Sequence, residues 1–302
     1  MTLRPSVAQA LTEAGIEPAD AERAVRAALD EDLHYGPDHT TAATAPAGAT
    51  ALAAVVARQA GVLAGLPVGL AVLDAAGLDP GAARVAGRDG GEVGPGTEVL
   101  RIQAPLRELL GAERTLLNFL THLSGIATAT RAWVDEVAGT GCVVRDTRKT
   151  TPGLRQLEKY AVRCGGGRNH RMGLGDAALI KDNHVAAAGG VGAAIRAVRS
   201  AAPGLPLEVE CDDLDQVREA LGAGAGLILL DNMGLDDLRA AVALARACPQ
   251  TRLEASGGLR LATAPAVAQT GVDFIAVGAL THSSPALDLG LDLLPEPGAR
   301  PH

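Results

Sequence analysis

Residues 206–232 have the sequence PLEVECDDLDQVREALGAGAGLILLDN, and they establish the fold class of the chain. The outer parts, PLEVEC and GLILLDN, are short apolar runs of the kind that forms buried strands. The part between them, LDQVREALGAG, is helix-like. This order of strand, helix and strand predicts a βα unit belonging to a parallel sheet.

The same alternation extends over the whole second half of the chain. The other strand-like runs are CVVRD (142–146), AALIKD (177–182), RLEASGG (252–258) and DFIAVGAL (273–280). Six strands at regular spacing predict an α/β barrel, either incomplete or completed by further elements, and a doubly wound open sheet is the competing architecture.

Each of these runs ends in residues that can take part in catalysis or binding, which favours the barrel over the open sheet. They are Asp146–Lys149, Lys181, Glu210, Asp231, Ser256 and Gly278. In α/β barrels the active site lies at the carboxyl ends of the strands, so six such residues in succession indicate a barrel enzyme.

The first half of the chain has a different pattern. Residues 6–14 and 18–33 are expected to be helices, and Pro18 suits the first position of the second one. Strands within 51–65 and 96–105 flank a helix near 67–77, which indicates a small mixed α+β unit. From Leu106 to about Val137 the apolar spacing predicts a long helix, for which Ser124-Gly125 is the candidate point of interruption.

The composition of the chain indicates which classes of protein it can belong to. The chain has 302 residues, 47% of them hydrophobic, which suits one large or two ordinary globular domains. A net charge of −8 and an aromatic content of 2% disfavour nucleic-acid binding. No apolar run is long enough to span a membrane, and no secretion signal is expected at the N-terminus. Four scattered cysteines without CxxC spacing indicate reduced thiols in a cytoplasmic protein.

A dense cationic block stands out in this acidic chain. Residues 146–184 carry Arg148, Lys149, Arg155, Lys159, Arg163, Arg168, His170, Arg171, Lys181 and His184. Such a block predicts a pocket for a small anion bearing several charges. The plainer alternatives are a solvated loop at Arg148-Lys149, a structural role for His170, and an ion pair of Lys181 with Asp182.

Two further groups of residues point to the rest of a site. Glu210 and Asp231, at the ends of neighbouring strands, suit Mg²⁺ or sugar hydroxyls as partners. Glu208 shares the face of Glu210, and which of the two points inward stays open. Backbone amides at Ser256-Gly257-Gly258 and at Gly278 predict a phosphate cradle.

The chain resembles the quinolinate phosphoribosyltransferase family. The resemblance rests on RDTRKTTPGLRQLEKYAV, GGGRNHRMGLGDAALIKDNH, LEVE, LILLDNM, LEASGGL and GVDFIAVGALTHS. It is strong from about Glu113 to Leu289 and weaker toward the N-terminus. It implies a type II phosphoribosyltransferase fold, with an N-terminal α/β sandwich (1–125), an irregular open six-stranded α/β barrel (126–285) and a C-terminal tail (286–302) that packs on the N-terminal domain.

The resemblance also implies a reaction. Quinolinate and 5-phosphoribosyl 1-diphosphate would give nicotinate mononucleotide, diphosphate and CO₂, with Mg²⁺, in a homodimer or an assembly of dimers that share active sites. The implied roles are quinolinate binding by Arg114 (from the partner subunit), Arg148, His170, Arg171 and Lys181; diphosphate binding by Lys149 and Lys181; ribose and Mg²⁺ binding by Glu210 and Asp231; and 5-phosphate binding by Ser256, Gly257 and Gly278, with His282 close by.

Two alternatives stay open at this point. One is a relative that uses nicotinate, a monocarboxylate, without decarboxylation; the number of cations around the expected site favours the dicarboxylate. The other is a non-catalytic anion-binding barrel, against which the intact Glu210 and Asp231 argue.

Overall fold

The structure is a computed structural model that describes residues 2–295, and it divides into two compact units. Of the described residues, unit 1 comprises 2–129, 151–166 and 283–295, while unit 2 comprises 130–150 and 167–282. The division is interleaved, because residues 151–166 return to unit 1 between two segments of unit 2. Residues 296–302 of the expected C-terminal tail lie outside the described residues.

Unit 1 combines a small sheet with helices. Its elements are α1 (Pro5–Glu13), α2 (Pro18–Leu33), α3 (His39–Thr44), β1 (Thr50–Ala57), β2 (Gly61–Val62), α4 (Leu66–Ala75), a 3₁₀ turn (Pro80–Ala82), β3 (Ala83–Val85), β4 (Glu92–Val93), β5 (Glu98–Pro105), most of α5 (Leu106–Glu136), α6 (Arg155–Cys164) and β12 (Leu289–Leu294). The expected helices at residues 6–14 and 18–33 are confirmed. The expected strand within 51–65 is broken, because β1 ends at Ala57 and only a two-residue strand follows.

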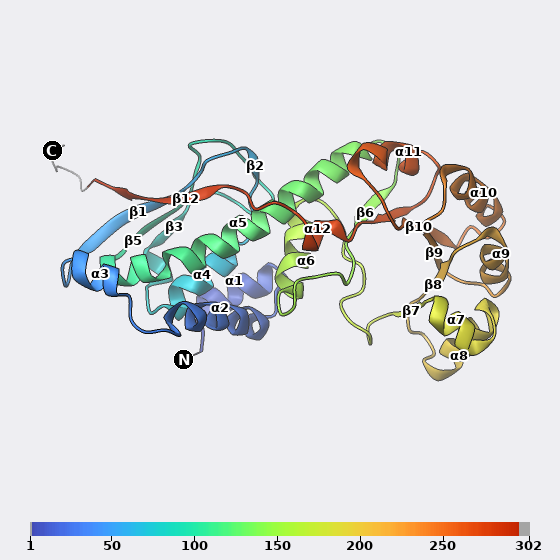
Figure 1. The fold of residues 1–302 in the computed structure, drawn as a ribbon, viewed down its shortest axis with the longest axis horizontal. Coiled ribbons are helices and arrows are strands. Elements are labelled where there is room, and N and C mark those ends of the chain that lie inside the picture. The colour runs from blue at the N-terminus through green and yellow to red at the C-terminus, as the bar shows by residue number, and fades with distance from the viewer. Residues whose placement is uncertain (1, 296–302) are drawn as a thin grey trace. The chain divides into compact units, whose positions relative to one another are not determined.

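The main sheet of unit 1 has the order β12-β1-β5-β3, and β1 pairs antiparallel with both neighbours. Figure 1 shows the sheet with helices α4 and α5 beneath it. Helix α4 packs tightly on α5, since a Cβ added to Gly69 would lie 3.1 Å from Leu116 Cδ1. Helices α1 and α2 contact α4 in turn, so the core of this unit lies between the sheet and the helices.

Helix α5 runs from Leu106 to Glu136 without the break expected at Ser124-Gly125. Ser124 Oγ accepts a hydrogen bond from the Ala64 N–H at 3.0 Å. Gly125 makes room for the chain at Pro285, whose carbonyl oxygen would be 2.1 Å from an added Cβ. The two small residues therefore permit close packing on a continuous helix, and the interpretation of this pair as a break was wrong.

Unit 2 is built from βα repeats. Its elements are β6 (Val143–Arg145), β7 (Ala178–Ile180), α7 (Asp182–Ala188), α8 (Val191–Ala201), β8 (Leu207–Cys211), α9 (Leu214–Gly222), β9 (Leu227–Asp231), α10 (Leu235–Ala245), β10 (Arg252–Ser256), a 3₁₀ turn (Leu261–Thr263), α11 (Ala264–Ala268), β11 (Phe274–Ala276) and α12 (Ala279–His282). All six strand-like runs of the sequence form strands, in the places predicted.

The six strands form one parallel sheet in the order β6-β11-β10-β9-β8-β7. From β7 to β11 each strand lies beside the next one in the chain, and β6 closes on β11. A doubly wound sheet would instead add strands on both sides of the first one. With β6 and β7 as its two edges, the sheet is an open-sided barrel, as expected.

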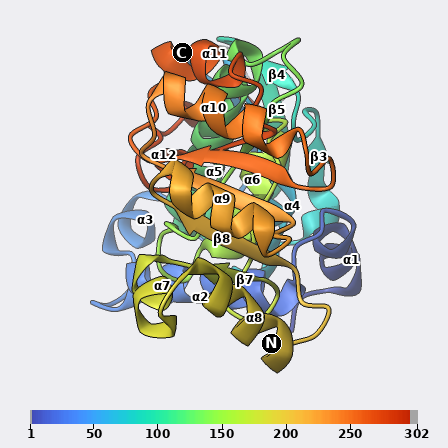
Figure 2. The same ribbon diagram turned by 90° about the vertical axis from the view of Figure 1, so that its right-hand side faces the viewer.

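Helices α8, α9 and α10 lie side by side outside the sheet, as Figure 2 shows. Helix α9 shows why the sequence folds this way: Asp213 caps it by accepting hydrogen bonds from the backbone N–H groups of Asp215 and Gln216. Val217 and Ala220 are its buried residues. The helices thus shield one side of the strands and leave the strand ends available for a site.

All four cysteines are free thiols. Burial raises the pKa of Cys142 and of Cys211 to about 12, so both thiols stay protonated and unreactive at neutral pH. No helix within residues 2–295 has the length and apolar character needed to cross a membrane.

The packing of Gly125 generates a test with an internal control on the same helix. Gly125→Ala should destabilise the protein by about 1–3 kcal/mol, because the new methyl group collides with the backbone at Pro285. Gly111→Ala meets no atom within 4 Å and should stabilise the protein by up to about 1 kcal/mol. Chemical denaturation of the two variants compares them, and equal effects would contradict this packing.

Candidate active site

A cavity of about 540 Å³ opens at the carboxyl ends of the strands of unit 2. Its lining consists of Thr147, Arg148, Lys149, His170, Arg171, Leu179, Lys181, Glu210, Leu229, Asp231, Asn232, Glu254, Ser256, Gly257, Gly258 and Ala276. A smaller hollow of about 210 Å³ shares Lys149, Ser256 and Gly257 with it and adds Gly278 and His282. The structure therefore brings together every site residue expected from the sequence except Arg114.

Arg114 lies on α5 in unit 1, where it is exposed, and it does not line the cavity. The cationic block is divided in a similar way. Arg155, Lys159 and Arg163 belong to α6 of unit 1, and Arg168 and His184 are absent from the lining of the cavity. The part of the block that forms an anion pocket is Arg148, Lys149, Arg171 and Lys181, with His170 beside them.

Arg148 and Arg171 lie close together. Burial, and then the positive charge of Arg148, lower the pKa of Arg171 below its ordinary value. Arg171 Nη1 donates a hydrogen bond to the Ala177 carbonyl at 2.9 Å, whereas the buried Arg148 Nε has no partner among the described residues. Two partly desolvated guanidinium groups that line one cavity favour a bound anion, and each of them can hold a carboxylate with two hydrogen bonds.

Carboxylates line the same cavity as this pair. Lys181 Nζ donates a hydrogen bond to Glu210 Oε2 at 2.6 Å, so the plainer pairing of Lys181 with Asp182 is not the one formed. Asn232 Nδ2 donates to Asp231 Oδ2 at 2.6 Å. Glu210 and Asp231 end the adjacent strands β8 and β9, and each carboxylate uses one oxygen in these bonds. Such hard oxygens fit a cation or the hydroxyl groups of a sugar.

Glycines crowd the neighbouring strand ends. Gly257 has φ +88°, and a Cβ there would lie 2.3 Å from Asn232 Oδ1. At Gly278 a Cβ would lie 2.9 Å from Lys149 Cδ. Only glycine fits both positions without movement, and the backbone N–H groups there stay open to an anion such as phosphate.

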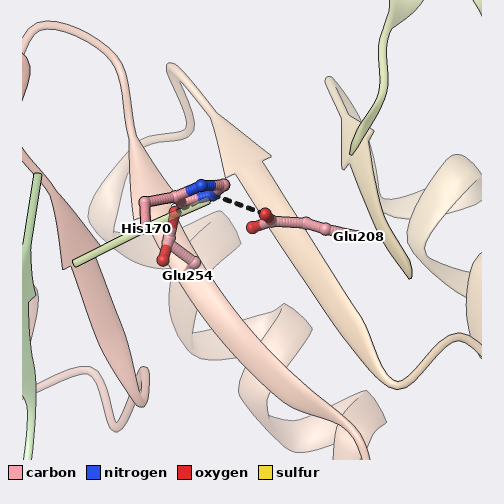
Figure 3. Close-up of side chains that lie close together, drawn as sticks. All are labelled: His170, Glu208 and Glu254. Carbon is pink, nitrogen blue, oxygen red and sulfur yellow. Dashed lines mark hydrogen bonds and ion pairs between the residues drawn. The ribbon is translucent and has the colours of Figure 1, made fainter. Parts of the chain in front are cut away.

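The floor of the cavity holds a buried cluster of His170, Glu208 and Glu254 (Figure 3). The His170 Nε2 atom lies 2.6 Å from Glu208 Oε2 and 3.5 Å from Glu254 Oε1. Arg145 Nη1 donates to Glu254 Oε2 at 2.6 Å. Burial, with the charge of Glu208, raises the pKa of Glu254 to about 8 although Arg145 opposes the shift.

This cluster answers the question about Glu208 and Glu210. Both side chains point to the same side of β8, as alternation requires. Glu210 lines the cavity and pairs with Lys181, while Glu208 lies below it and pairs with His170. Sequence reasoning did not select Glu254, although it stands two residues before Ser256 on the same strand and therefore on the same face.

The sequence and the fold are similar to those of known proteins. The family model for the quinolinate phosphoribosyl transferase N-terminal domain matches residues 38–124, and that for the C-terminal domain matches residues 126–292. The carboxylating nicotinate-nucleotide pyrophosphorylase of Mycobacterium leprae is 55% identical over 277 residues, covering 91% of this chain and 98% of that protein. A probable enzyme of the same name from Bacillus subtilis is 42% identical over 245 residues, covering 80% of this chain and 83% of that protein. The crystal structure of nicotinate-nucleotide pyrophosphorylase from Ehrlichia chaffeensis superposes with a TM-score of 0.84 at 37% identity, covering 90% of this chain and 98% of that one.

The raised pKa of Glu254 predicts how stability depends on pH. A folded-state pKa of about 8 against an ordinary 4.5 means that the folded protein holds a proton which the unfolded chain releases. The contribution of this proton to the free energy of unfolding is fully present below about pH 4.5 and is lost as the pH rises toward 8. Glu254→Gln should remove that part of the pH dependence, on the order of 1–4 kcal/mol. Denaturation of both proteins between pH 5 and 8 measures it; identical slopes would show that Glu254 is ionised throughout.

Proposed function

The chain belongs to the quinolinate phosphoribosyltransferase family, and from this premise we propose which residues of the cavity carry out its reaction. The enzyme transfers phosphoribosyl from 5-phosphoribosyl 1-diphosphate to quinolinate and releases diphosphate and CO₂, a step of NAD biosynthesis. The observation that carries the assignment of residues is the Arg148–Arg171 pair on the cavity wall. Quinolinate bears two neighbouring carboxylates, which match two neighbouring guanidinium groups.

In the proposed complex the cations orient the dicarboxylate. Arg148, Arg171 and Lys181 contact the carboxylates of quinolinate, with the ring of His170 beside them, and this aims the pyridine nitrogen at C1 of the ribose. The nitrogen forms a bond to C1 while the bond from C1 to the diphosphate oxygen breaks. Lys149 and Lys181 stabilise the negative charge that the leaving diphosphate gains.

The second stage needs no covalent participation by the protein. The bond between the ring and its 2-carboxylate breaks, CO₂ leaves, and the electron pair on the ring carbon takes up a proton. The positive ring nitrogen stabilises that electron pair. In the proposed complex the 5-phosphate binds at Ser256, Gly257 and Gly278, which line one hollow together with His282.

We also propose Mg²⁺ as the metal ion of the reaction. Glu210 and Asp231 fit it, because two carboxylates on adjacent strands, together with substrate oxygens and water, make a typical Mg²⁺ site. The ion would neutralise part of the diphosphate charge. Glu210 is held in place by Lys181 at 2.6 Å.

Two proposals concern the setting of the enzyme. The first is a homodimer, or an assembly of dimers, in which Arg114 completes the partner's site; it is supported by the exposure of Arg114 and its absence from the cavity of its own chain. The second is a cytoplasmic location, which four free thiols favour.

Product analysis tests the reaction directly. The purified protein, given quinolinate, 5-phosphoribosyl 1-diphosphate and Mg²⁺, should form nicotinate mononucleotide and CO₂ in equal amounts. Nicotinate in place of quinolinate should give little product, because one carboxylate leaves the guanidinium pair half-occupied. Efficient use of nicotinate without CO₂ would favour the non-decarboxylating alternative, and binding of quinolinate without any turnover the non-catalytic one.

Variants then test the assigned residues. Arg148→Ala and Lys181→Ala should each lower kcat/KM for quinolinate by about a hundredfold or more, because each leaves buried charge on the substrate unpaired. Arg239→Ala is the matched control, since Arg239 is an exposed arginine on α10 that pairs with Asp236. Near-normal kinetics of a folded Arg148→Ala enzyme would overturn its role.

Mixing two inactive variants tests the shared site. Arg114→Ala and Lys181→Ala proteins, unfolded and refolded together, should recover on the order of a quarter of the normal activity, because half of the dimers are mixed and each of those has one intact site. The same variants refolded separately are the control. No recovery from well-formed mixed dimers would mean that Arg114 serves its own chain.

A further inference from the structure

The imidazole of His170 is engaged at both ring nitrogens. Its Nδ1 atom accepts a hydrogen bond from the backbone N–H of Arg171 at 2.7 Å, and its Nε2 atom lies 2.6 Å from Glu208 Oε2 (Figure 3). A nitrogen that accepts from an N–H group carries no proton of its own. The proton of the ring therefore sits on Nε2 and is donated to Glu208.

We propose that Glu208 is a positioning residue of this enzyme: it holds His170 as the neutral Nε2–H tautomer, and His170 in turn fixes the backbone of Arg171. The inference rests on the proposed function in one respect, the binding of quinolinate by Arg171. It changes the role of His170, which becomes a neutral support for a cation instead of a cation itself.

Arg171 is consequently held at both ends. Its backbone N–H is bound by His170, and its guanidinium donates to Ala177 O at 2.9 Å. The residues before it are anchored as well, since Asp146 accepts from the His170 N–H at 2.8 Å and from Asn169 Nδ2 at 2.6 Å. A segment that begins with three glycines has much backbone freedom to lose, and these bonds give it one conformation before substrate arrives.

The second carboxyl group of the cluster supports this arrangement. Glu254 Oε1 lies 3.5 Å from His170 Nε2, and Glu254 Oε2 accepts a hydrogen bond from Arg145 Nη1 at 2.6 Å. Glu208 Oε1 and Glu254 Oε1 are both buried without a hydrogen-bond partner among residues 2–295. Because burial and the charge of Glu208 raise the pKa of Glu254 to about 8, Glu254 holds a proton at neutral pH, which leaves Glu208 as the acceptor for His170.

The same three residues could be taken for a metal site, because their donor atoms lie within 4.8 Å of one another. The hydrogen bonds oppose this. A cation on Nε2 would have to displace the ring proton while Nδ1 still accepts from Arg171, which would turn the imidazole into an anion. A hydrogen-bonded support is therefore the arrangement that the geometry favours.

A nitrogen NMR measurement on the free wild-type protein tests the tautomer without any activity. With ¹⁵N-labelled histidine, two-bond correlations of the His170 ring at neutral pH should show a protonated Nε2 and an unprotonated Nδ1. A doubly protonated ring, or a proton on Nδ1, would overturn the proposal. Because no substrate is present, this result stands apart from the success or failure of the proposed reaction.

Kinetics of two Glu208 variants test the consequence for Arg171. Glu208→Ala removes the acceptor and should raise KM for quinolinate about tenfold or more, while KM for 5-phosphoribosyl 1-diphosphate changes by less than about twofold. Glu208→Gln keeps an acceptor oxygen at the same place and should recover most of the loss. Equal losses in both variants would show that the charge of Glu208 matters and not its hold on His170. A fall in kcat with both KM values unchanged would contradict a role of Glu208 in positioning Arg171 for quinolinate.

Discussion

Two guanidinium groups, those of Arg148 and Arg171, line one cavity partly out of water and repel each other, and the rest of the site depends on this constraint. Arg148 follows β6 and Arg171 lies before β7, so the two edges of the open sheet supply the pair. Repulsion makes this arrangement costly in the free protein, and a negative charge near both groups would relieve that cost. The two edges of the sheet therefore give the cavity a wall that is suited to an anion.

The acidic side chains in and beneath the cavity are paired with groups other than Arg148 and Arg171. Glu210 neutralises Lys181 at the rim, and Asp231 is held by Asn232, so neither carboxylate competes directly for the guanidinium pair. Below them, Glu208 and Glu254 lie next to one imidazole and one further arginine, Arg145. The site thus consists of a layer of charged groups that line the cavity and a buried layer of charged groups beneath it.

The sequence predicted the strands of unit 2 well, because each is a short apolar run bounded by polar residues, and period and length alone identify such runs. The strand-end residues followed, because parallel strands bring their carboxyl ends together.

Two features could not be predicted from the sequence. Helix α5 was expected to break because Ser124-Gly125 is a weak helix former in isolation, whereas the packing of this pair against Ala64 and Pro285 involves residues distant in the chain. Glu254 was passed over because a carboxyl group within an apolar run has no local signature; its role depends on Arg145 and Glu208, which the fold brings to it. The cationic block likewise appeared as one surface, and only the contacts of α6 assign part of it to unit 1.

The position of β12 near the end of the described chain affects the order in which the first sheet can form during synthesis. Strand β1 spans residues 50–57, and its partner β12 spans 289–294, so one edge of the first sheet is the last described strand to leave the ribosome. All strands of unit 2 are made earlier, and those from β7 to β11 pair with neighbours that are adjacent in the chain, whereas β6 pairs with the distant β11. Contacts between such distant segments form slowly, since a long loop must close before any pairing energy is gained. During translation unit 2 can therefore fold before β12 is synthesised and pairs with β1. Until β12 has paired, that edge of β1 is exposed and can pair with a strand of another chain.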